Sequence, residues 1–220
     1  KEGISQSGQE VTLAVAQSMG RRESSVCRMA SASHTDVIPV DIGIASSCKI
    51  DGVLDEKIAC GTRNFAKEPA MTEKETLDAI DTGVRLAKQC KEKGYQILAT
   101  GEMGIGNTTT SSAVTAALLH RLASETAGRG AGLNDKGLSR KKQVIQEAID
   151  RYDLYKADAF TVLQTVGGLD IAGLTGVFIG GAIYHVSIVL YWIINGAAAL
   201  LSKRIISGTE HFFIASPLGK

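Results

Sequence analysis

The residues of this chain that could do chemistry gather in one short segment, residues 101–109, with the sequence GEMGIGNTT. The segment follows an apolar run at residues 95–100 and precedes a run of small and aliphatic residues that begins at Ala113. This order predicts a buried strand, a glycine-bearing loop and the first turns of a helix. A helix N-terminus presents unpaired N–H groups and the positive end of the helix dipole, so such a loop is suited to bind an anion such as a phosphate.

Glycines in this loop would let a ligand approach the backbone. Gly104 and Gly106 can take positive φ and carry no Cβ that would block a phosphate. Asn107, Thr108 and Thr109 can cap the helix or contact the ligand. The pattern is neither a P-loop nor the dinucleotide fingerprint, because no Gly-Lys-Ser/Thr follows and the glycine spacing differs. A tight turn that uses glycine only for its geometry is an equal alternative.

Glu102 bears on the kind of anion that this loop would accept. Its carboxylate, two residues before Gly104, would repel a bare phosphate. It suits a ligand that carries a cationic or hydroxyl-bearing group beside its phosphate, such as a ribosyl group. The loop therefore indicates a sugar phosphate rather than inorganic phosphate.

Composition excludes several classes of function. The chain has 220 residues, enough for one domain with a substantial core. Lys and Arg number 24 against 23 Asp and Glu, a net charge of +1, so no basic footprint for nucleic acid is present. Aromatic residues make up only 5% of the chain, which disfavours a stacking platform for single strands.

Cysteine and histidine usage indicates a reduced protein without a metal site or cofactor. No CxxC pair occurs and the histidines are isolated, so we expect neither a zinc site nor a secreted disulfide framework, and we expect a cytoplasmic location without a signal peptide. The residues concerned are Cys27, Cys48, Cys60, Cys90, His34, His120, His185 and His211.

One segment could also belong to a membrane protein. Residues 171–201 contain no Asp, Glu, Lys or Arg, and about 20 apolar residues suffice to span a bilayer. The alternative is a buried helix, strand and helix of an α/β protein, in which strands covered on both faces read as continuous apolar runs. Glycines together with His185 and Asn195 divide the segment into pieces of that size, which favours the buried core and no membrane contact.

The remaining chain alternates strands with helices, which predicts an α/β fold with a Rossmann-like parallel sheet flanked by helices. Thr72 and Glu75 form a capping box at the start of one helix. Asp41 ends a strand, where it is equally a ligand-binding residue or a turn residue. We expect strands at residues 26–30, 37–43, 95–100, 188–193 and 212–215, a long connection at residues 51–71, and helices at residues 11–19, 72–94, 113–119, 142–149, 157–166 and 196–204, with a further glycine-bearing helix start capped by Asp170.

Six motifs, in order over nearly the whole chain, resemble the nicotinate-nucleotide:dimethylbenzimidazole phosphoribosyltransferase family. Their joint presence is far more specific than any one of them. The resemblance implies a Rossmann-like fold, a homodimer and a place in the assembly of the lower nucleotide loop of cobalamin. The motifs are EGISQSGQEVT at residues 2–12, PVDIGI at 39–44, GTRNFAKEPAMT at 61–72, ATGEMGIGNTTTSSAV at 99–114, GRGAGL at 128–133 and VGGLDIAGLTGVFIGGA at 166–182.

The reaction that the resemblance implies moves phosphoribose from nicotinate mononucleotide to 5,6-dimethylbenzimidazole, with inversion at the anomeric carbon. The products are α-ribazole 5′-phosphate and nicotinate. The 5′-phosphate must be anchored, and the incoming base must lose its N–H proton to a general base. The departing nicotinate needs no acid because its nitrogen leaves from a pyridinium, and a carboxylate can steady the positive ribosyl group of the transition state.

The resemblance also assigns candidate site residues. Glu102 is the catalytic candidate, and four neighbours would complete the phosphoribosyl site. Lys141 would bind the phosphate, Asp170 would lie nearby, Ser5 would lie near the aromatic base, and Asp41 is a weaker candidate. The four neighbours of Glu102 are Gly104, Ile105, Gly106 and Asn107.

Two departures from the family pattern accompany the resemblance. The family's general-base glutamate lies in an Arg-Leu-Gly-Glu-Gly type of segment that would follow Lys220. We expect one phosphoribosyltransferase-like domain at residues 1–220 that is incomplete relative to the family at both ends. Without this glutamate, we expect the chain to be unable to turn over normally by itself. Tyr191 and Trp192 replace an Asp-Gly pair and would fill the site. The alternative function is therefore a catalytically silent nucleotide-binding homologue.

Overall fold

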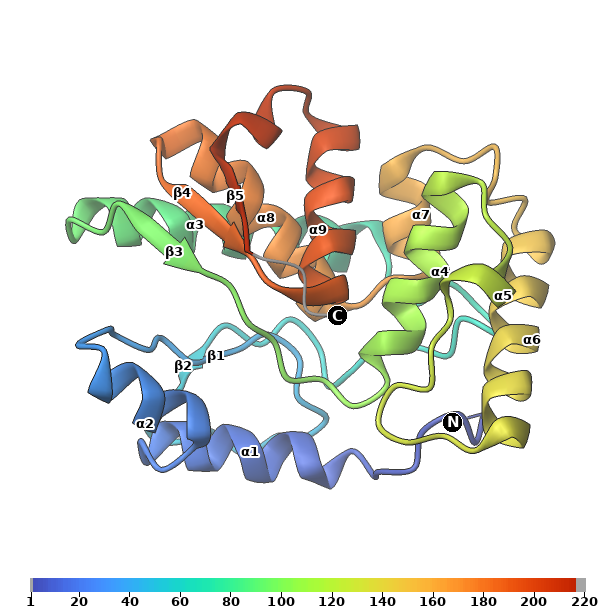
Figure 1. The fold of residues 1–220 in the computed structure, drawn as a ribbon, viewed down its shortest axis with the longest axis horizontal. Helices are drawn as coiled ribbons and strands as arrows, with labels where there is room; N and C mark the ends of the chain where they lie inside the picture. Colours follow the sequence, from blue (N-terminus) through green and yellow to red (C-terminus); the bar gives the residue numbers. More distant parts are fainter. Residues whose placement is uncertain (1, 217–220) are drawn as a thin grey trace.

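The structure, a computed structural model, describes residues 2–216 and has parallel strands in two small sheets (Figure 1). Strand β1 (Val40–Asp41) pairs with β2 (Leu54–Asp55). The second sheet has the order β3 (Ile97–Ala99), β4 (Ser187–Leu190) and β5 (Phe213–Ala215). The expectation of an α/β fold with parallel strands flanked by helices is confirmed, although the strands are shorter than the apolar runs that predict them.

Helices make up most of the described chain. In Figure 1, α3, α8 and α9 lie beside the three-stranded sheet, α4 to α7 form the other end of the molecule, and α1 and α2 lie below. The helices are α1 (Glu10–Gly20), α2 (Ser25–Ala32), α3 (Glu73–Glu92), α4 (Asn107–Leu119), α5 (Ala123–Thr126), α6 (Asp135–Arg151), α7 (Ala159–Val166), α8 (Leu169–Tyr184), α9 (Trp192–Ile205) and the short 3₁₀ helix η1 (Thr209–Phe212).

The register of the three-stranded sheet fixes where its loops emerge. Ala99 pairs with Val189, so β3 and β4 end side by side. The chain then leaves β3 toward α4 and leaves β4 toward α9 (Figure 1). The glycine-bearing loop and residues 191–192 therefore share the carboxyl edge of the sheet, where open parallel sheets bind ligands.

Helices α3 and α8 pack with their backbones in contact because glycines face each other. A Cβ on Gly83 would lie 2.0 Å from the carbonyl oxygen of Gly173, and a Cβ on Gly176 would lie 1.9 Å from that of Ile80. Phe178 on α8 is fully buried and meets Phe213 of β5 edge to face at 4.9 Å. This pair of helices forms the scaffold under the sheet.

Helix α3 begins with the predicted capping box, and this prediction is confirmed. The Glu75 N–H donates to Thr72 Oγ1 at 3.1 Å, and the Thr72 N–H donates to Glu75 Oε2 at 2.6 Å. The Arg63 guanidinium also pairs with the Glu75 carboxylate. Hydrogen bonding from Arg63 is the main reason that the pKa of Glu75 falls from 4.5 to about 2.

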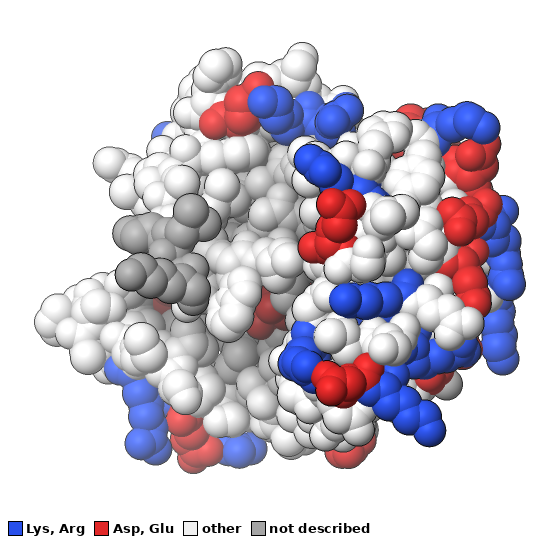
Figure 2. Space-filling model, turned by 45° about the vertical axis from the view of Figure 1, so that its right-hand side comes forward, with Lys and Arg blue, Asp and Glu red and all other residues white. Residues whose placement is uncertain are grey.

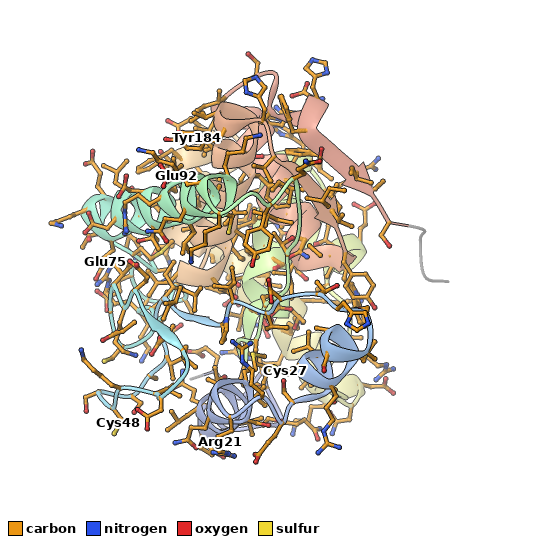
Figure 3. All side chains as sticks on the ribbon, turned by 90° about the vertical axis from the view of Figure 1, so that its left-hand side faces the viewer. Arg21, Cys27, Cys48, Glu75, Glu92 and Tyr184 are labelled. Carbon is orange, nitrogen blue, oxygen red and sulfur yellow. The ribbon has the colours of Figure 1, made fainter. Side chains whose placement is uncertain are left out.

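Three strand predictions need correction. Residues 26–30 form part of α2, because Ser24 caps a helix by accepting from the Cys27 N–H at 3.3 Å; Figure 3 shows Cys27 on this helix. β3 is an edge strand with Ile97 58% exposed, so the expected burial is wrong. The strand predicted at residues 188–193 ends at Leu190, since helix α9 already begins at Trp192.

Residues 171–201 fold as helix α8, strand β4 and the first part of α9. Ile171, Phe178 and Ile188 are completely buried in the core, which confirms the buried-core interpretation of this apolar segment. Within residues 2–216, none of the helices has the length and apolar character that a membrane crossing requires.

Candidate active site at the start of helix α4

The glycine-bearing loop between β3 and α4 is held from two sides. Gly106 occupies the N-cap position of α4 with φ 99°, a conformation that favours glycine. The Asn107 N–H donates to the Gly104 carbonyl at 3.1 Å, and the Ile105 N–H donates to Thr12 Oγ1 of α1 at 3.2 Å. Among the described residues no side chain caps α4, so its N-terminus stays open to a ligand.

Asn107 joins the two predicted carboxylates into one cluster. Its side-chain amide donates one hydrogen bond to Glu102 Oε2 and another to Asp170 Oδ2, the latter at 3.0 Å. Residues from the β3–α4 loop and from the start of α8, far apart in the sequence, therefore meet at one point. The structure thus places Asp170 beside the loop.

The two carboxyl groups of this cluster hold their protons more strongly than usual. Burial is the first cause that raises the pKa of Glu102, the nearby Asp170 adds to it, and the Asn107 hydrogen bond opposes it. Burial also raises the pKa of Asp170, again against the Asn107 hydrogen bond. Glu102 stands at the rim of the site, exposed on its outer side. The cluster can hold a proton or stabilise a developing positive charge.

Glycines keep the space around Asp170 open. A Cβ on Gly104 would lie 3.1 Å from Asp170 Oδ2, and a Cβ on Gly168 would lie 2.6 Å from Asp170 Oδ1. Gly168 is itself the N-cap of α8, so the helix start is confirmed. The prediction that Asp170 caps the helix is wrong, because Asp170 lies one position inside the first residue of the helix.

Lys141 provides a buried positive charge close to the same helix start. The side chain comes from α6, and the residue is 1% exposed. Its Nζ donates to Thr108 Oγ1 and to the Gly128 carbonyl, both at 3.0 Å. Burial lowers the pKa of Lys141, and no carboxylate in residues 2–216 pairs with it. The ammonium therefore has neutral partners only and lacks a compensating anion.

Two other charged residues, Asp41 and Arg129, have partners within the chain itself. Asp41 Oδ1 accepts from the N–H groups of Gly43 and Ile44, at 3.1 and 2.9 Å, and Asp41 Oδ2 accepts from Lys57 Nζ at 2.6 Å. This geometry favours the turn interpretation of Asp41. Arg129, in the motif at residues 128–133, pairs with Asp135 at the start of α6.

Ser5 lies apart from the carboxylate cluster, near the start of α6. Its hydroxyl donates to the Ser7 carbonyl at 3.2 Å. It lines a separate cavity of about 360 Å³. The other residues around this cavity are Gly3, Gln6, Leu133, Asn134, Lys136, Gly137 and Arg140.

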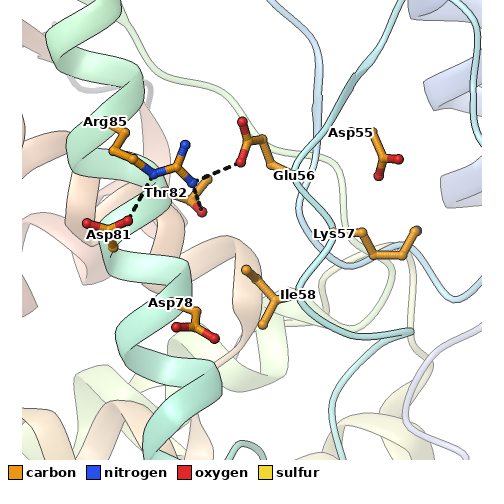
Figure 4. A pocket seen from close by; sticks show the side chains of 8 residues that line it. All are labelled: Asp55, Glu56, Lys57, Ile58, Asp78, Asp81, Thr82 and Arg85. Carbon is orange, nitrogen blue, oxygen red and sulfur yellow. Dashed lines mark hydrogen bonds and ion pairs between the residues drawn. The ribbon is translucent and has the colours of Figure 1, made fainter.

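A second cavity, of about 410 Å³, lies between β2 and α3 (Figure 4). Arg85 crosses it and bonds to Asp81 and Glu56, both at 2.9 Å. None of the predicted site residues lines this cavity. It is lined by Asp55, Glu56, Lys57, Ile58, Asp78, Asp81, Thr82 and Arg85.

Tyr191 and Trp192, which replace the Asp-Gly pair, lie on the surface of the described chain. Tyr191 is 60% exposed and Trp192 is 79% exposed. Both rings stand on the surface because the chain turns directly from β4 into α9, with Trp192 at φ 68°. The Asp-Gly position is therefore open to solvent in this structure.

Thr108, which the sequence indicates as a helix cap or ligand contact, is a hydrogen-bond partner of Lys141. The sequence patterns missed one residue that organises the site, Asn195. Asn195 on α9 is 2% exposed and donates to the Thr100 carbonyl at 2.9 Å, which ties α9 to the start of the glycine loop. A polar residue within a long apolar run was the available signal for Asn195.

The face drawn in Figure 2 agrees with the near-neutral charge of the chain. Figure 2 shows basic and acidic side chains interspersed over the right-hand side of that face, and a hollow near its centre with acidic atoms inside. This face therefore lacks the large, uniformly basic surface that a polyanion would bind.

The family model described as "Phosphoribosyltransferase" matches residues 1–220. The chain belongs to this phosphoribosyltransferase family. The resemblance seen in the sequence motifs is thereby confirmed. In this family context, the loop, the carboxylate cluster and the buried lysine described above are the candidate active site.

Named relatives and solved structures agree with this family. The nicotinate-nucleotide–dimethylbenzimidazole phosphoribosyltransferases of Clostridium perfringens (strain 13 / Type A) and Ruminiclostridium cellulolyticum are 38% and 40% identical over 216 residues, which is 98% of this chain and 60% and 61% of theirs. CobT from Thermus thermophilus superposes with a TM-score of 0.92 at 32% identity, over 97% of this chain and 64% of that one. The chain thus spans about 60% of the length of its relatives.

Proposed function

We propose that this chain carries the phosphoribosyl-binding part of an enzyme that transfers phosphoribose from nicotinate mononucleotide to a benzimidazole-type base, in cobalamin biosynthesis. The relatives named above carry this activity in their names. One observation carries the proposal: the buried Lys141 ammonium, without an anion, lies at the N-terminus of α4, which also starts beside the carboxylate cluster.

The two ends of this site suit the two ends of a ribosyl phosphate. Lys141, Thr108 and the first turn of α4 favour a phosphate, because they offer a charge, a hydroxyl and the positive end of the helix dipole, with no side-chain cap among the described residues. Glu102 and Asp170 favour positive charge that develops on the ribose as nicotinate leaves. Glycines at positions 104 and 106 allow the sugar to approach the backbone between them.

Further properties of the protein follow from the same proposal. Residues 1–220 would form a single α/β domain that works as a homodimer in the cytoplasm. The four cysteines of the described chain are free thiols, which fits a reducing compartment. A catalytically silent nucleotide-binding homologue is the alternative function, and product formation distinguishes the two.

Lys141→Met tests the proposal directly. We expect nicotinate mononucleotide to bind the wild-type protein in calorimetry, and the variant to bind it at least tenfold more weakly, about 1.4 kcal/mol, because the phosphate loses its cation. Nicotinate riboside, which lacks the phosphate, should bind both proteins equally.

Lys142→Met is the matched control for this experiment. Lys142 is the next residue on α6 and is partly exposed, so its loss should leave affinity unchanged. Equal affinity of wild type and Lys141→Met for the mononucleotide, or no binding to the wild type, would overturn the proposal. Formation of α-ribazole phosphate from the mononucleotide and dimethylbenzimidazole would exclude the silent homologue.

A further inference from the structure

Trp192 combines a strained backbone with an exposed aromatic ring. It adopts φ 68°, a region that bulky residues avoid and glycine occupies readily. The ring is 79% exposed, although indole is one of the largest apolar side chains. Neither local backbone preference nor burial in the core accounts for tryptophan at this position. An outlier of this kind at a sheet edge indicates a functional role.

The ring lies on the same edge of the sheet as the candidate site. β3 and β4 run parallel and in register up to Ala99 and Val189, so the chain segments that follow them emerge side by side. Two hydrogen bonds connect these segments: Asn195 Nδ2 donates to the Thr100 carbonyl at 2.9 Å, and Thr100 Oγ1 donates to the Val189 carbonyl at 3.4 Å. The first turn of α9 is therefore fixed against the start of the glycine loop.

Tyr191 lies against the indole of Trp192 and leaves at least one face of it uncovered. The two rings meet at 90° with their centroids 6.0 Å apart, an edge-to-face arrangement. In this arrangement one ring supports the other without stacking on it. A planar ligand can then stack on a face of the indole.

We propose that Trp192 stacks on the heteroaromatic base of the substrate and positions it over the phosphoribosyl site, with Tyr191 as a support. The inference rests on the proposed function, because the base must arrive beside a bound ribosyl phosphate. Stacking on an aromatic side chain accepts any planar heterocycle, so the ligand is either the benzimidazole-type acceptor or the nicotinate ring. The Asp-Gly pair that the family has at positions 191 and 192 carries no aromatic side chain for such stacking.

Tryptophan fluorescence can test the proposal because Trp192 is the only tryptophan in the chain. We expect saturable quenching of its emission by 5,6-dimethylbenzimidazole or by nicotinate mononucleotide, in separate titrations that identify the ring. Ribose 5-phosphate, which has no aromatic ring, should bind in calorimetry without quenching.

Trp192→Gly and Trp192→Phe then separate stacking from folding. Glycine suits φ 68°, so this variant should unfold at the same or a higher denaturant concentration than the wild type. It should bind the quenching ligand about tenfold more weakly in calorimetry, which is the usual effect of losing one base–aromatic stack. Phenylalanine should retain most of the affinity. Ribose 5-phosphate should bind all three proteins equally.

Three results would overturn the inference. The first is that Trp192→Gly binds both heterocycles with an affinity within twofold of the wild type. The second is that neither heterocycle quenches the tryptophan emission. The third is that the emission depends on protein concentration alone, which would place a second copy of the chain on the ring. If ribose 5-phosphate still binds in a Lys141-dependent manner, the proposed function stands and only the role of Trp192 fails. If neither sugar phosphate binds, the proposed function itself fails.

Discussion

Helices α3 and α4 begin in contrasting ways. At the start of α3, the side chains of Thr72, Glu75 and Arg63 satisfy the first turn and one another. At the start of α4, Gly106 takes the N-cap position and, within residues 2–216, no side chain caps the turn. Glycines of α3 also contact the backbone of α8, so a Cβ on them would clash. A Cβ on Gly106, at the start of α4, would meet no atom within 4 Å.

This contrast separates scaffold from site. A helix start that satisfies its own N–H groups gains stability and has nothing left for a ligand. A start left open costs stability and offers donors and a positive dipole end to an anion. The same residue, glycine, serves close packing in α3 and α8 and access in the loop before α4. Substitutions in the two helices should therefore have different effects.

The largest effect is expected from Gly83→Ala in α3. The new methyl group would lie 2.0 Å from the Gly173 carbonyl oxygen and 2.6 Å from the Val177 N, so the two helices must separate. We expect the free energy of unfolding to fall by about 3 kcal/mol, at the upper end for overpacking, as measured by urea denaturation.

Gly196→Ala in α9 is the control for this prediction. A Cβ there meets nothing within 4 Å, so the change should raise the free energy of unfolding by about 0.5–1 kcal/mol through helix propensity. Equal effects of the two substitutions would show that contact between the backbones of α3 and α8 does not limit stability.

Glu75→Gln should have an intermediate effect that depends on pH. Glutamine can keep the capping box but loses the charge opposite Arg63, so we expect a loss of about 1–2 kcal/mol at pH 7. The pKa of Glu75 is lower in the folded state, about 2 instead of 4.5. Its contribution is therefore fully present above pH 4.5 and is lost as the pH falls toward about 2.

Urea denaturation of the wild type and Glu75→Gln at several pH values checks this sign. The difference in free energy of unfolding should shrink steadily below pH 4.5, the ordinary pKa of this side chain. Glu73→Gln, in the same turn of α3, is the control and should change stability by less than about 0.5 kcal/mol. A difference that grows as the pH falls would contradict the assignment of the ion pair.

Gly106→Ala should lower stability by no more than Glu75→Gln does, and it should have a separate effect on binding. Alanine at φ 99° is strained by about 1–2 kcal/mol, but the methyl group finds no steric conflict in the protein. It would lie where the proposed phosphate approaches, so the affinity for nicotinate mononucleotide should fall at least fivefold in calorimetry, about 1 kcal/mol.

Gly94→Ala provides a control with matched strain. Gly94 has φ 91°, and a Cβ there would also meet no atom within 4 Å, but this residue follows the C-terminal end of α3. Both variants should lose similar stability, and only Gly106→Ala should lose affinity. If both bind the mononucleotide like the wild type, the open start of α4 is a turn and not a phosphate site.

Sequence patterns predicted the long helices well and the strands less well. The helix that begins at Thr72 combines a capping box with apolar residues at helical spacing, two local signals that agree. The run at residues 26–30 has the composition of a strand, but the cap at Ser24 and the lack of a neighbouring strand within the described residues make it helical. Short apolar runs fit both states, and tertiary contacts decide between them.

The sequence predicted the individual residues of the site but not the contacts between them. Glycines and Asn107 beside a helix start mark the loop by local chemistry alone. That Asn107 would bridge Glu102 and Asp170 required α8 to lie beside α4, and this follows from long-range packing. The role of Asp41 was open in the sequence, because only the folded chain brings Lys57 to its carboxylate.

By itself, the sequence determined the family, the alternation of helices with parallel strands, and the glycine loop with its carboxylate, because these depend on residue types at short spacing. Only the tertiary structure decided that Lys141 is buried without an anion beside Thr108, and that Trp192 stands exposed at the sheet edge. The physical reason is that burial and charge pairing depend on which distant segments pack together. Local sequence sets what a residue can do, and packing sets what it faces.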